Sequence, residues 1–349
     1  MKNLLKKARE EKNFKTRELA QLLGIDQALV SKFESGSRKP TKEQVIKLAA
    51  ILEIDYETIM ITWLKEKIIY EIGDESLALK ALEEAQKELK NSRSNSLNTV
   101  STALQKLLDN IALLKTKLDK FRQFESHNVI QAIDLEYTFN SNRLEGNTLT
   151  FQETDLVINQ GLTIPGKTMK EHLEIINHIE ALAYVKGLVE KNIVLNEKEL
   201  LSIHYILARG IQLDDAGRYR KTEVNIRGIN NLSPHPQQIT KEIEDFFMWY
   251  ESHKNTLHPI IVAAEMHLRI HRIRPFTTSN GKTERLLQNY VLLQHGYVFA
   301  DIKGDDENRL LYQLLLAKSQ NSGNKENFLL FVAKTEKESL ERYLERIAQ

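Results

Sequence analysis

The sequence predicts a mainly α-helical protein that carries one short β-hairpin. Glycine and proline are scarce, at 14 and 6 of 349 residues, and apolar residues recur mostly at spacings of three and four. One interruption, residues 217–236, contains an alternating polar and apolar run at 223–227, then turn residues and two prolines, which is typical of a hairpin. With 41% apolar and 28% charged residues, the chain can bury a sizeable core.

Composition also excludes several classes of protein. Cysteine is absent, which excludes disulfides, thiolate zinc sites and cysteine nucleophiles, and we expect no metal site. The chain has no apolar run of about eighteen residues, so we expect no membrane span and no membrane partner. The charged N-terminus has neither an apolar core nor a cleavage site, so a cytoplasmic protein is expected.

Three segments are expected along the chain. Residues 1–63 form a small first domain, residues 64–127 a helical connector, and residues 128–349 a second domain with its core at about 128–330. The polar stretch 91–96 is the most linker-like part of the sequence.

A heptad-like apolar stripe lies in the connector and has two interpretations. It is the seam of a coiled-coil homodimer, or one face of a helix that packs on the following domain of the same chain. The stripe consists of Leu97, Val100, Leu104, Leu107, Ile111, Leu114, Leu118 and Phe121.

The first domain has the charge and spacing of a DNA-binding unit. Residues 1–50 hold twelve Lys and Arg against six Asp and Glu, a net charge of +6 in a chain whose total is +1. Thr16 is placed to cap one helix, Gly24 to end it, and Asp26 to cap a second helix that can enter a major groove. The positive charge by itself is equally explained by a charged surface that faces only solvent. The candidate DNA contacts are Thr16, Gln27, Ala28, Ser31, Lys32, Arg38 and Lys39.

This region resembles the Cro/repressor-type (XRE) helix-turn-helix family. The matching segments are residues 18–24 and 30–40, and the resemblance covers about residues 2–52. Thr16 departs from the family, which often has Gln at the start of this helix. The resemblance implies DNA as a partner, and a protein-interaction domain of the same shape is the alternative.

A second candidate site lies at residues 275–285, where a polar loop enters a leucine-rich helix. Free backbone amides at a helix N-terminus, helped by Gly281, can hold a phosphate group. Lys282 and Arg285 are three residues apart, so they share one face of the helix and add positive charge. A capped surface helix is the alternative. The candidate phosphate-binding residues are Asn280, Gly281, Lys282 and Arg285.

Residues 267–287 resemble the Fic-domain signature, HPFx[DE]GNGRxxR, and two further motifs follow the family's order. The resemblance covers about residues 128–330. It implies AMP transfer from ATP to a hydroxyl of a protein target, and a pairing of Glu145 with Arg285 that closes the site. Ser141, Glu145 and Gly146 match the inhibitory helix, while Arg220, Val224 and Ile226 match the flap, a hairpin that docks a target segment as an added strand.

The signature is altered at its catalytic positions. The resemblance implies that a histidine deprotonates the target hydroxyl and that an acidic residue holds magnesium. In this sequence the histidine position is Arg274 and the acidic position is Thr278. Three other positions of the signature also differ: Ser279, Lys282 and Glu284. A guanidinium stays protonated, so Arg274 cannot act as a general base, and losing a base typically costs ~10²–10⁴ in rate. Thr278 offers only a neutral hydroxyl to a metal that prefers carboxylates. We therefore expect no intact catalytic residue and little support for magnesium.

Two histidines precede the altered motif on the same helix. We expect His267 to have a structural role, and His271 as a substitute base is the alternative. Asn280, Gly281 and Arg285 keep the anion-binding half of the motif, so ATP or another nucleotide remains a candidate ligand.

The leading hypothesis is a DNA-bound regulator whose degenerate Fic domain binds a nucleotide, a phosphate ligand or a partner protein. Two alternatives stay open. One is a Fic-type protein adenylyltransferase controlled by its inhibitory helix. The other is an inactive partner of an active Fic protein in a toxin–antitoxin-like system.

Overall fold

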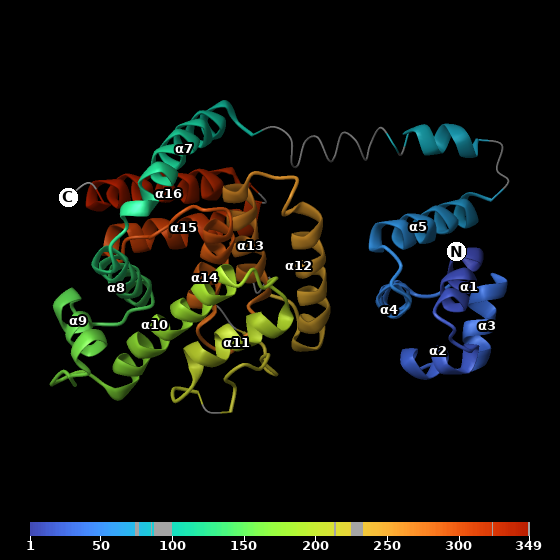
Figure 1. The fold of residues 1–349 in the computed structure, drawn as a ribbon, viewed down its shortest axis with the longest axis horizontal. Coiled ribbons are helices and arrows are strands. Elements are labelled where there is room, and N and C mark those ends of the chain that lie inside the picture. Colours follow the sequence, from blue (N-terminus) through green and yellow to red (C-terminus); the bar gives the residue numbers. More distant parts are fainter. Residues whose placement is uncertain are drawn as a thin grey trace. The chain divides into compact units, whose positions relative to one another are not determined.

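The computed structural model of the protein describes residues 1–73, 77–84, 86, 100–212, 214–224, 233–322 and 324–347. The chain divides into two compact units, Met1–Thr99 and Val100–Gln349, which are drawn in Figure 1. Every regular element within the described residues is a helix, so the α-helical class is correct.

The first unit is a set of short helices around its own apolar core. Gly24, with φ of 68°, lets the chain turn after the second helix, and Asp26 caps the third by accepting from the amide two residues on at 2.6 Å, as predicted. Thr16 is not a cap: it is the first helical residue, and the Lys15 amide donates to Glu18 Oε2 at 2.7 Å. The helices are α1 (Lys2–Glu11), α2 (Thr16–Leu23), α3 (Gln27–Ser35), α4 (Lys42–Leu52) and α5 (Tyr56–Ile72).

The second unit is a helical body. Its elements in chain order are α7 (Thr102–Phe121), η1 (Arg122–Phe124), α8 (His127–Leu144), α9 (Phe151–Gln160), α10 (Met169–Glu190), α11 (Glu197–Ala208), η2 (Pro236–Gln238), α12 (Ile239–His253), α13 (Pro259–Ile273), α14 (Asn280–Gln294), α15 (Asp306–Ser322) and α16 (Glu326–Ile347). α13 and α14 pack against each other, and most of their side chains are buried. α14 also contacts α8, α10 and α11, which fixes the start of α14 relative to the end of α8.

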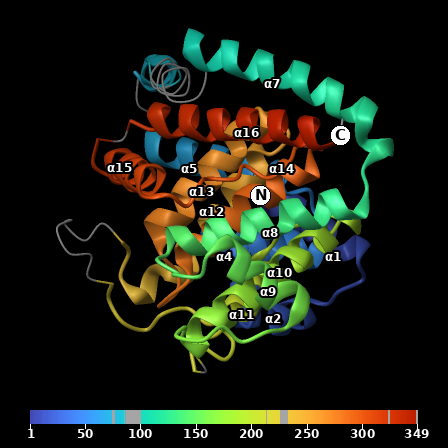
Figure 2. The same cartoon turned by 90° about the vertical axis from the view of Figure 1, so that its left-hand side faces the viewer.

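The apolar stripe of α7 packs along α16 within the same chain, as Figure 2 shows. Of the stripe, Leu104, Ile111 and Leu118 are buried in the main core of the second unit, Val100, Leu107 and Leu114 are partly buried against it, and Phe121 is exposed. The intramolecular interpretation of the stripe therefore explains its periodicity. Its first member, Leu97, lies outside the described residues.

The predicted β-hairpin is wrong. Val224 lies in irregular structure, no strand occurs in the described part of the chain, and Ile226 lies outside that part. Arg220 explains the path of the segment: it is 2% exposed, its amide donates to Pro275 O at 2.9 Å and its Nε donates to Arg274 O at 2.7 Å. The guanidinium also donates to two carbonyls of its own segment. The described start of the segment is thus tied at Arg220 to the loop after α13, and the Arg220 side chain is engaged in these hydrogen bonds.

Candidate functional site

The loop between α13 and α14 carries the altered motif and has an unusual backbone. Arg274 and Ser279 have positive φ values of 46° and 57°, a region that non-glycine residues adopt rarely. Asn280 holds the loop closed, because its Oδ1 accepts from the Phe276 amide at 3.1 Å and its Nδ2 donates to Phe276 O at 2.7 Å. The Asn280 side chain is therefore used inside the loop, and only its backbone amide is left for a ligand.

His204, on α11, supports this loop. Its ring stacks on Phe276 with centroids 3.6 Å apart, its Nδ1 accepts from the Gly217 amide at 3.0 Å, and its Nε2 lies 3.2 Å from Thr278 O. Because Nδ1 accepts, Nε2 carries the hydrogen and donates to the carbonyl. Burial lowers the pKa of His204 to about 4, which keeps the ring neutral. Sequence reasoning missed this residue, although a lone histidine among the apolar residues of α11 was a usable signal.

Glu145 lies just after α8, over the first turn of α14. Its Oε1 accepts a hydrogen bond from Arg285 Nη2 at 3.0 Å, so the expected pair is present. Gly281 permits this approach, since a Cβ at that position would collide with Glu145 Oε1 and lie 3.1 Å from Arg285 Nη1. The carboxylate therefore sits at the helix N-terminus, where backbone amides and the helix dipole favour an anion.

Arg285 is held from two sides by the end of α8. It is 2% exposed, its Nε donates to Ser141 Oγ at 3.0 Å, and its Nη2 donates to Ser141 O at 2.9 Å as well as to Glu145. A guanidinium fixed by three bonds is already oriented before any ligand arrives. Removal of the Glu145 carboxylate would leave the Arg285 Nη2 donor available to another anion.

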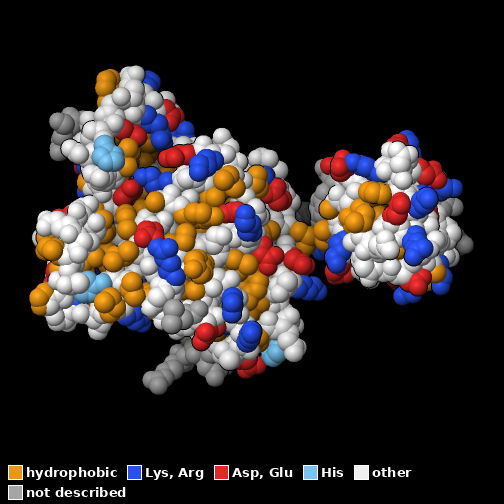
Figure 3. All heavy atoms as spheres, turned by 60° about the horizontal axis from the view of Figure 1, so that its bottom comes forward, with side chains coloured by type: hydrophobic (Ala, Val, Ile, Leu, Met, Phe, Trp, Pro, Cys, Tyr) orange, Lys and Arg blue, Asp and Glu red, His pale blue; other side chains and the backbone are white. Residues whose placement is uncertain are grey.

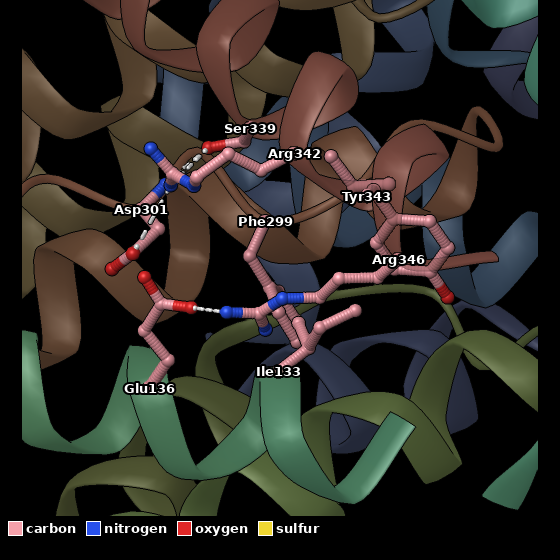
Figure 4. A pocket seen from close by; sticks show the side chains of 9 residues that line it. Ile133, Glu136, Phe299, Asp301, Ser339, Arg342, Tyr343 and Arg346 are labelled. Carbon is pink, nitrogen blue, oxygen red and sulfur yellow. Dashed lines mark hydrogen bonds and ion pairs between the residues drawn. The ribbon is translucent and has the colours of Figure 1, made fainter. Parts of the chain in front are cut away.

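The C-terminal end of α8, which precedes Glu145, is anchored by a buried polar network, part of which Figure 4 shows. Asn140 Nδ2 donates to Asp301 Oδ2 at 2.8 Å, and the Gly304 amide donates to Asn140 Oδ1 at 3.1 Å. One turn earlier on α8, Glu136 pairs with Lys303 and Arg346. These contacts fix α8 against the 301–304 segment and α16, and thereby fix the position of Glu145 over α14.

Lys282 does not extend freely into the site. It is 3% exposed, and its Nζ lies 3.7 Å from Glu174 Oε1 on α10. Burial lowers the pKa of Lys282, partly offset by Glu174 and Glu145. Its position behind Gly281 lets it add positive charge to the start of α14.

The residues at the motif's acidic position do not fit a magnesium ion. Thr278 has no carboxylate, and its carbonyl accepts a hydrogen bond from His204. In the part of the chain that the structure describes, no group of three or more His, Cys, Asp or Glu side chains could hold a metal ion. The donor set at this position therefore lacks the carboxylate ligand that magnesium prefers beside phosphates.

Arg274 Nε is buried and has no hydrogen-bond partner in the described structure, and the charge of Arg274 acts on the buried acid Glu284. Glu284 is 1% exposed, and its Oε2 lies 3.0 Å from His271 Nδ1 and 3.6 Å from His267 Nε2. Burial alone would raise the pKa of Glu284, but His271, His267 and Arg274 hold it below its ordinary value. His267 is fully buried between Gln288 and Tyr312, as expected of a structural residue.

The candidate DNA contacts lie mostly on one exposed surface of the first unit. Gln27, Ala28, Ser31 and Lys32 are exposed on α3, and Arg38 is exposed in the following loop. Figure 3 shows Lys and Arg side chains among Asp and Glu on the visible face of this unit. Four candidates make hydrogen bonds within the unit. Thr16 Oγ1 accepts from Gln27 Nε2 at 3.1 Å, Ser31 Oγ donates to Gln27 O at 3.3 Å, and Lys39 Nζ donates to Glu66 O at 2.7 Å.

Comparisons with known proteins identify both units. The Fic/DOC family model matches residues 194–292, and a helix-turn-helix family model matches residues 5–59. Two relatives named Protein adenylyltransferase Fic are 30% identical to this chain. The one from Nematostella vectensis aligns over 72% of this chain and 59% of its own length, and the one from Drosophila yakuba over 60% and 41%. The chain therefore spans roughly half of the length of these relatives.

Solved structures show the same fold. A fragment of Fic-1 from C. elegans superposes with a TM-score of 0.61 at 22% identity, covering 99% of this chain and 97% of that fragment. A Fic family protein from Desulfovibrio desulfuricans G20 gives 0.61 at 21% identity over 72% and 77%. The second unit is thus a Fic fold. The chain carries a Fic domain and, in its first unit, an XRE-type helix-turn-helix domain.

No helix in the described part of the chain is both long enough and apolar enough to span a bilayer.

Proposed function

We propose that this protein is a DNA-bound regulator whose Fic domain binds the phosphates of a nucleotide such as ATP under the control of Glu145. The observation that carries this proposal is the Glu145 carboxylate against Gly281 and Arg285. A carboxylate held at the start of α14 occupies a site suited to a phosphate oxygen, because both are anions that accept hydrogen bonds from the same donors.

Transfer of AMP should be inefficient because of the residues at two positions of the motif, Arg274 and Thr278. Arg274 cannot take a proton from a target hydroxyl, because its guanidinium stays protonated. Thr278 supplies no carboxylate for the metal that bridges nucleotide phosphates in many transferases. Nucleotide binding depends mainly on backbone amides and Arg285, which both remain.

The partners and location of the protein follow from the same assignment. We assign DNA binding to residues 1–63 and nucleotide binding to residues 128–349, with the connector between them, in the cytoplasm. A protein target is a further candidate partner of the Fic domain, as the names of the adenylyltransferase relatives suggest.

Calorimetric titration of the full chain with ATP and ADP, without added metal, tests the nucleotide proposal. The wild-type protein should bind weakly, and Glu145→Gly should bind at least about tenfold more tightly, because a hydrogen bond to a charged group contributes about 1.5–3 kcal/mol. A matched control is Glu153→Gln, on α9 outside the motif. Absence of binding by both Glu145 forms at millimolar nucleotide would leave the Fic domain as a scaffold.

Residual adenylyltransferase activity is a second candidate function, favoured by one observation. His271 Nδ1 lies 3.0 Å from the buried Glu284 Oε2, an arrangement that orients an imidazole and stabilises the imidazolium formed when Nε2 takes a proton. His271 could then accept the proton of a target hydroxyl as that hydroxyl attacks the α-phosphate of ATP and pyrophosphate leaves. Incorporation of label from ATP that is lost in His271→Ala, with ATP binding retained, would establish it.

A further inference from the structure

A second arginine, Arg309, lies beside the Glu145 site without a partner of its own. Its Nη2 lies 3.7 Å from the position that a Cβ on Gly146 would take, and Gly146 directly follows Glu145. Arg309 is half-buried in the first turn of α15. Within the described part of the chain its guanidinium forms neither a hydrogen bond nor an ion pair. Arg285, by contrast, is held by three hydrogen bonds.

The face of α15 that carries Arg309 is turned toward the pair formed by Glu145 and Arg285. Tyr312 is three residues further along α15 and therefore lies on the same face. It is 5% exposed, and its ring centroid lies 5.9 Å from Arg285 Cζ. Tyr312 thus lies in the interior next to Arg285, whereas Arg309 lies one turn nearer to solvent, at the edge of the site beside Gly146.

The charges of the site leave a role for a further cation. A nucleoside diphosphate or triphosphate carries several negative charges, and one phosphate can take the place of the Glu145 carboxylate. Thr278 provides no carboxylate for the magnesium ion that usually offsets the remaining charge. Lys282 already lies 3.7 Å from the carboxylate of Glu174. An unpaired guanidinium at the edge of the site is suited to a neighbouring phosphate, since it can donate two parallel hydrogen bonds to one phosphate group.

We propose that Arg309 binds a second phosphate of the nucleotide and makes the site selective for nucleoside diphosphates and triphosphates over monophosphates. This inference rests on the proposed function. One phosphate replaces the Glu145 carboxylate at the start of α14, and Arg309 pairs with the next phosphate without a metal ion. A monophosphate has no second phosphate, so it leaves Arg309 unused. Arg309 is thus a specificity-determining residue for binding and takes no part in proton transfer.

Calorimetric titration of the full chain with AMP, ADP and ATP, without added metal, tests this assignment in the Glu145→Gly background, where the phosphate site is open. ADP and ATP should bind more tightly than AMP. Arg309→Gln should weaken ADP and ATP binding at least about tenfold, as the loss of a hydrogen bond to a charged group implies, and should change AMP binding less than about twofold. Arg309→Lys should keep only part of the preference, because an ammonium group cannot donate two parallel hydrogen bonds. Arg17→Gln, at an exposed position on α2, is the control and should change nothing.

Two results would overturn this inference while leaving the proposed function in place. These are unchanged ADP affinity in Arg309→Gln, and an equal loss of AMP and ADP affinity, which would indicate a general structural role. If thermal melting shows that Arg309→Gln does not fold, Arg309→Lys decides the matter, since a ratio of ADP to AMP affinity equal to that of the parent would contradict the assignment. Absence of binding of all three nucleotides by Glu145→Gly itself would instead overturn the proposed function and this inference together.

Discussion

Glu284 Oε2 lies 3.0 Å from His271 Nδ1 inside the α13–α14 pair, and the same carboxylate is held ionised in part by the charge of Arg274. In the Fic signature the residue at position 284 is usually small, and position 274 is the catalytic histidine. Both departures from the signature therefore place charged groups in one region: Glu284 pairs with His271, and the charge of Arg274 adds to that of the histidines in lowering the pKa of Glu284. An arginine introduced at the motif would be poorly tolerated without a nearby buried anion.

This relationship predicts a large loss of stability in Glu284→Ala. The change leaves His271 Nδ1 without its buried hydrogen-bond partner, and leaving a buried polar group unsatisfied typically costs ~1–3 kcal/mol, more where the lost partner is charged. Chemical denaturation of the full chain would measure it. Glu284→Gln keeps the volume and is the matched control for cavity formation; an effect of Glu284→Ala below about 1 kcal/mol would show that the carboxylate is not needed.

A second prediction concerns Gly281. A methyl group at this position would collide with the place that Glu145 Oε1 occupies and would crowd Arg285 Nη1. In a Glu145→Gly background, Gly281→Ala should therefore weaken ATP binding about tenfold or more by blocking close approach of the phosphate. Calorimetry checks this, and Gly187→Ala, where a Cβ meets no other atom within 4 Å, is the control. Equal affinity of the two alanine variants would argue against binding at this turn.

A third prediction concerns pH. Burial lowers the pKa of His204 to about 4, whereas an unperturbed histidine titrates near 6.5. The unfolded chain therefore binds a proton between about pH 6.5 and pH 4 that the folded chain does not bind, so stability is complete above this window and falls as the pH is lowered through it.

His204→Asn should reduce that pH dependence. The slope of unfolding free energy against pH should become shallower by about 1.4 kcal/mol per unit, the contribution of one proton. Denaturant unfolding at several pH values would show it. His127→Asn, at an exposed position, is the control, and an unchanged slope in His204→Asn would mean that another group carries the effect.

A fourth prediction separates two kinds of DNA contact on α3. Lys32→Ala should weaken binding to all sequences and lower the slope of log affinity against log salt by about 0.9, as the loss of one phosphate contact requires. Gln27→Ala should instead relax sequence preference. Binding assays on full-length protein at several salt concentrations distinguish them. Lys198→Ala, in the Fic domain, is the charge-matched control, and unchanged binding in both α3 variants would rule out this helix as the recognition helix.

The sequence alone predicted the structure correctly where neighbouring residues determine it. Gly24 predicts the end of α2, because a helix often ends at a residue that can adopt positive φ. Asp26 predicts the start of α3, because a short side chain that accepts a hydrogen bond caps the first amides of a helix. The resemblance of the motifs around Glu145 and Gly281 to the Fic family predicted the approach of Glu145 to Arg285, although they lie far apart in the chain.

Sequence reasoning failed where distant groups compete for the same atoms. The alternation at residues 223–227 suggested a hairpin, but Arg220 directs its segment to the carbonyls of residues 274 and 275. The hydrogen bond from Lys39 to a carbonyl of α5 was likewise not foreseen, and the contact of Lys39 with a phosphate stays a prediction. The charges of Arg274 and Glu284 could be read from the sequence, but their proximity depends on how α13 packs against α14.

Nucleotide binding without efficient transfer is tested most directly by incubating Glu145→Gly with ATP labelled at the α-phosphate and measuring both bound and covalently incorporated label. The Arg274→His/Thr278→Asp form of the same variant, with magnesium, restores the two missing groups and serves as the comparison. We predict saturable binding by Glu145→Gly with incorporation at background level. Robust covalent labelling of Glu145→Gly itself would contradict this function.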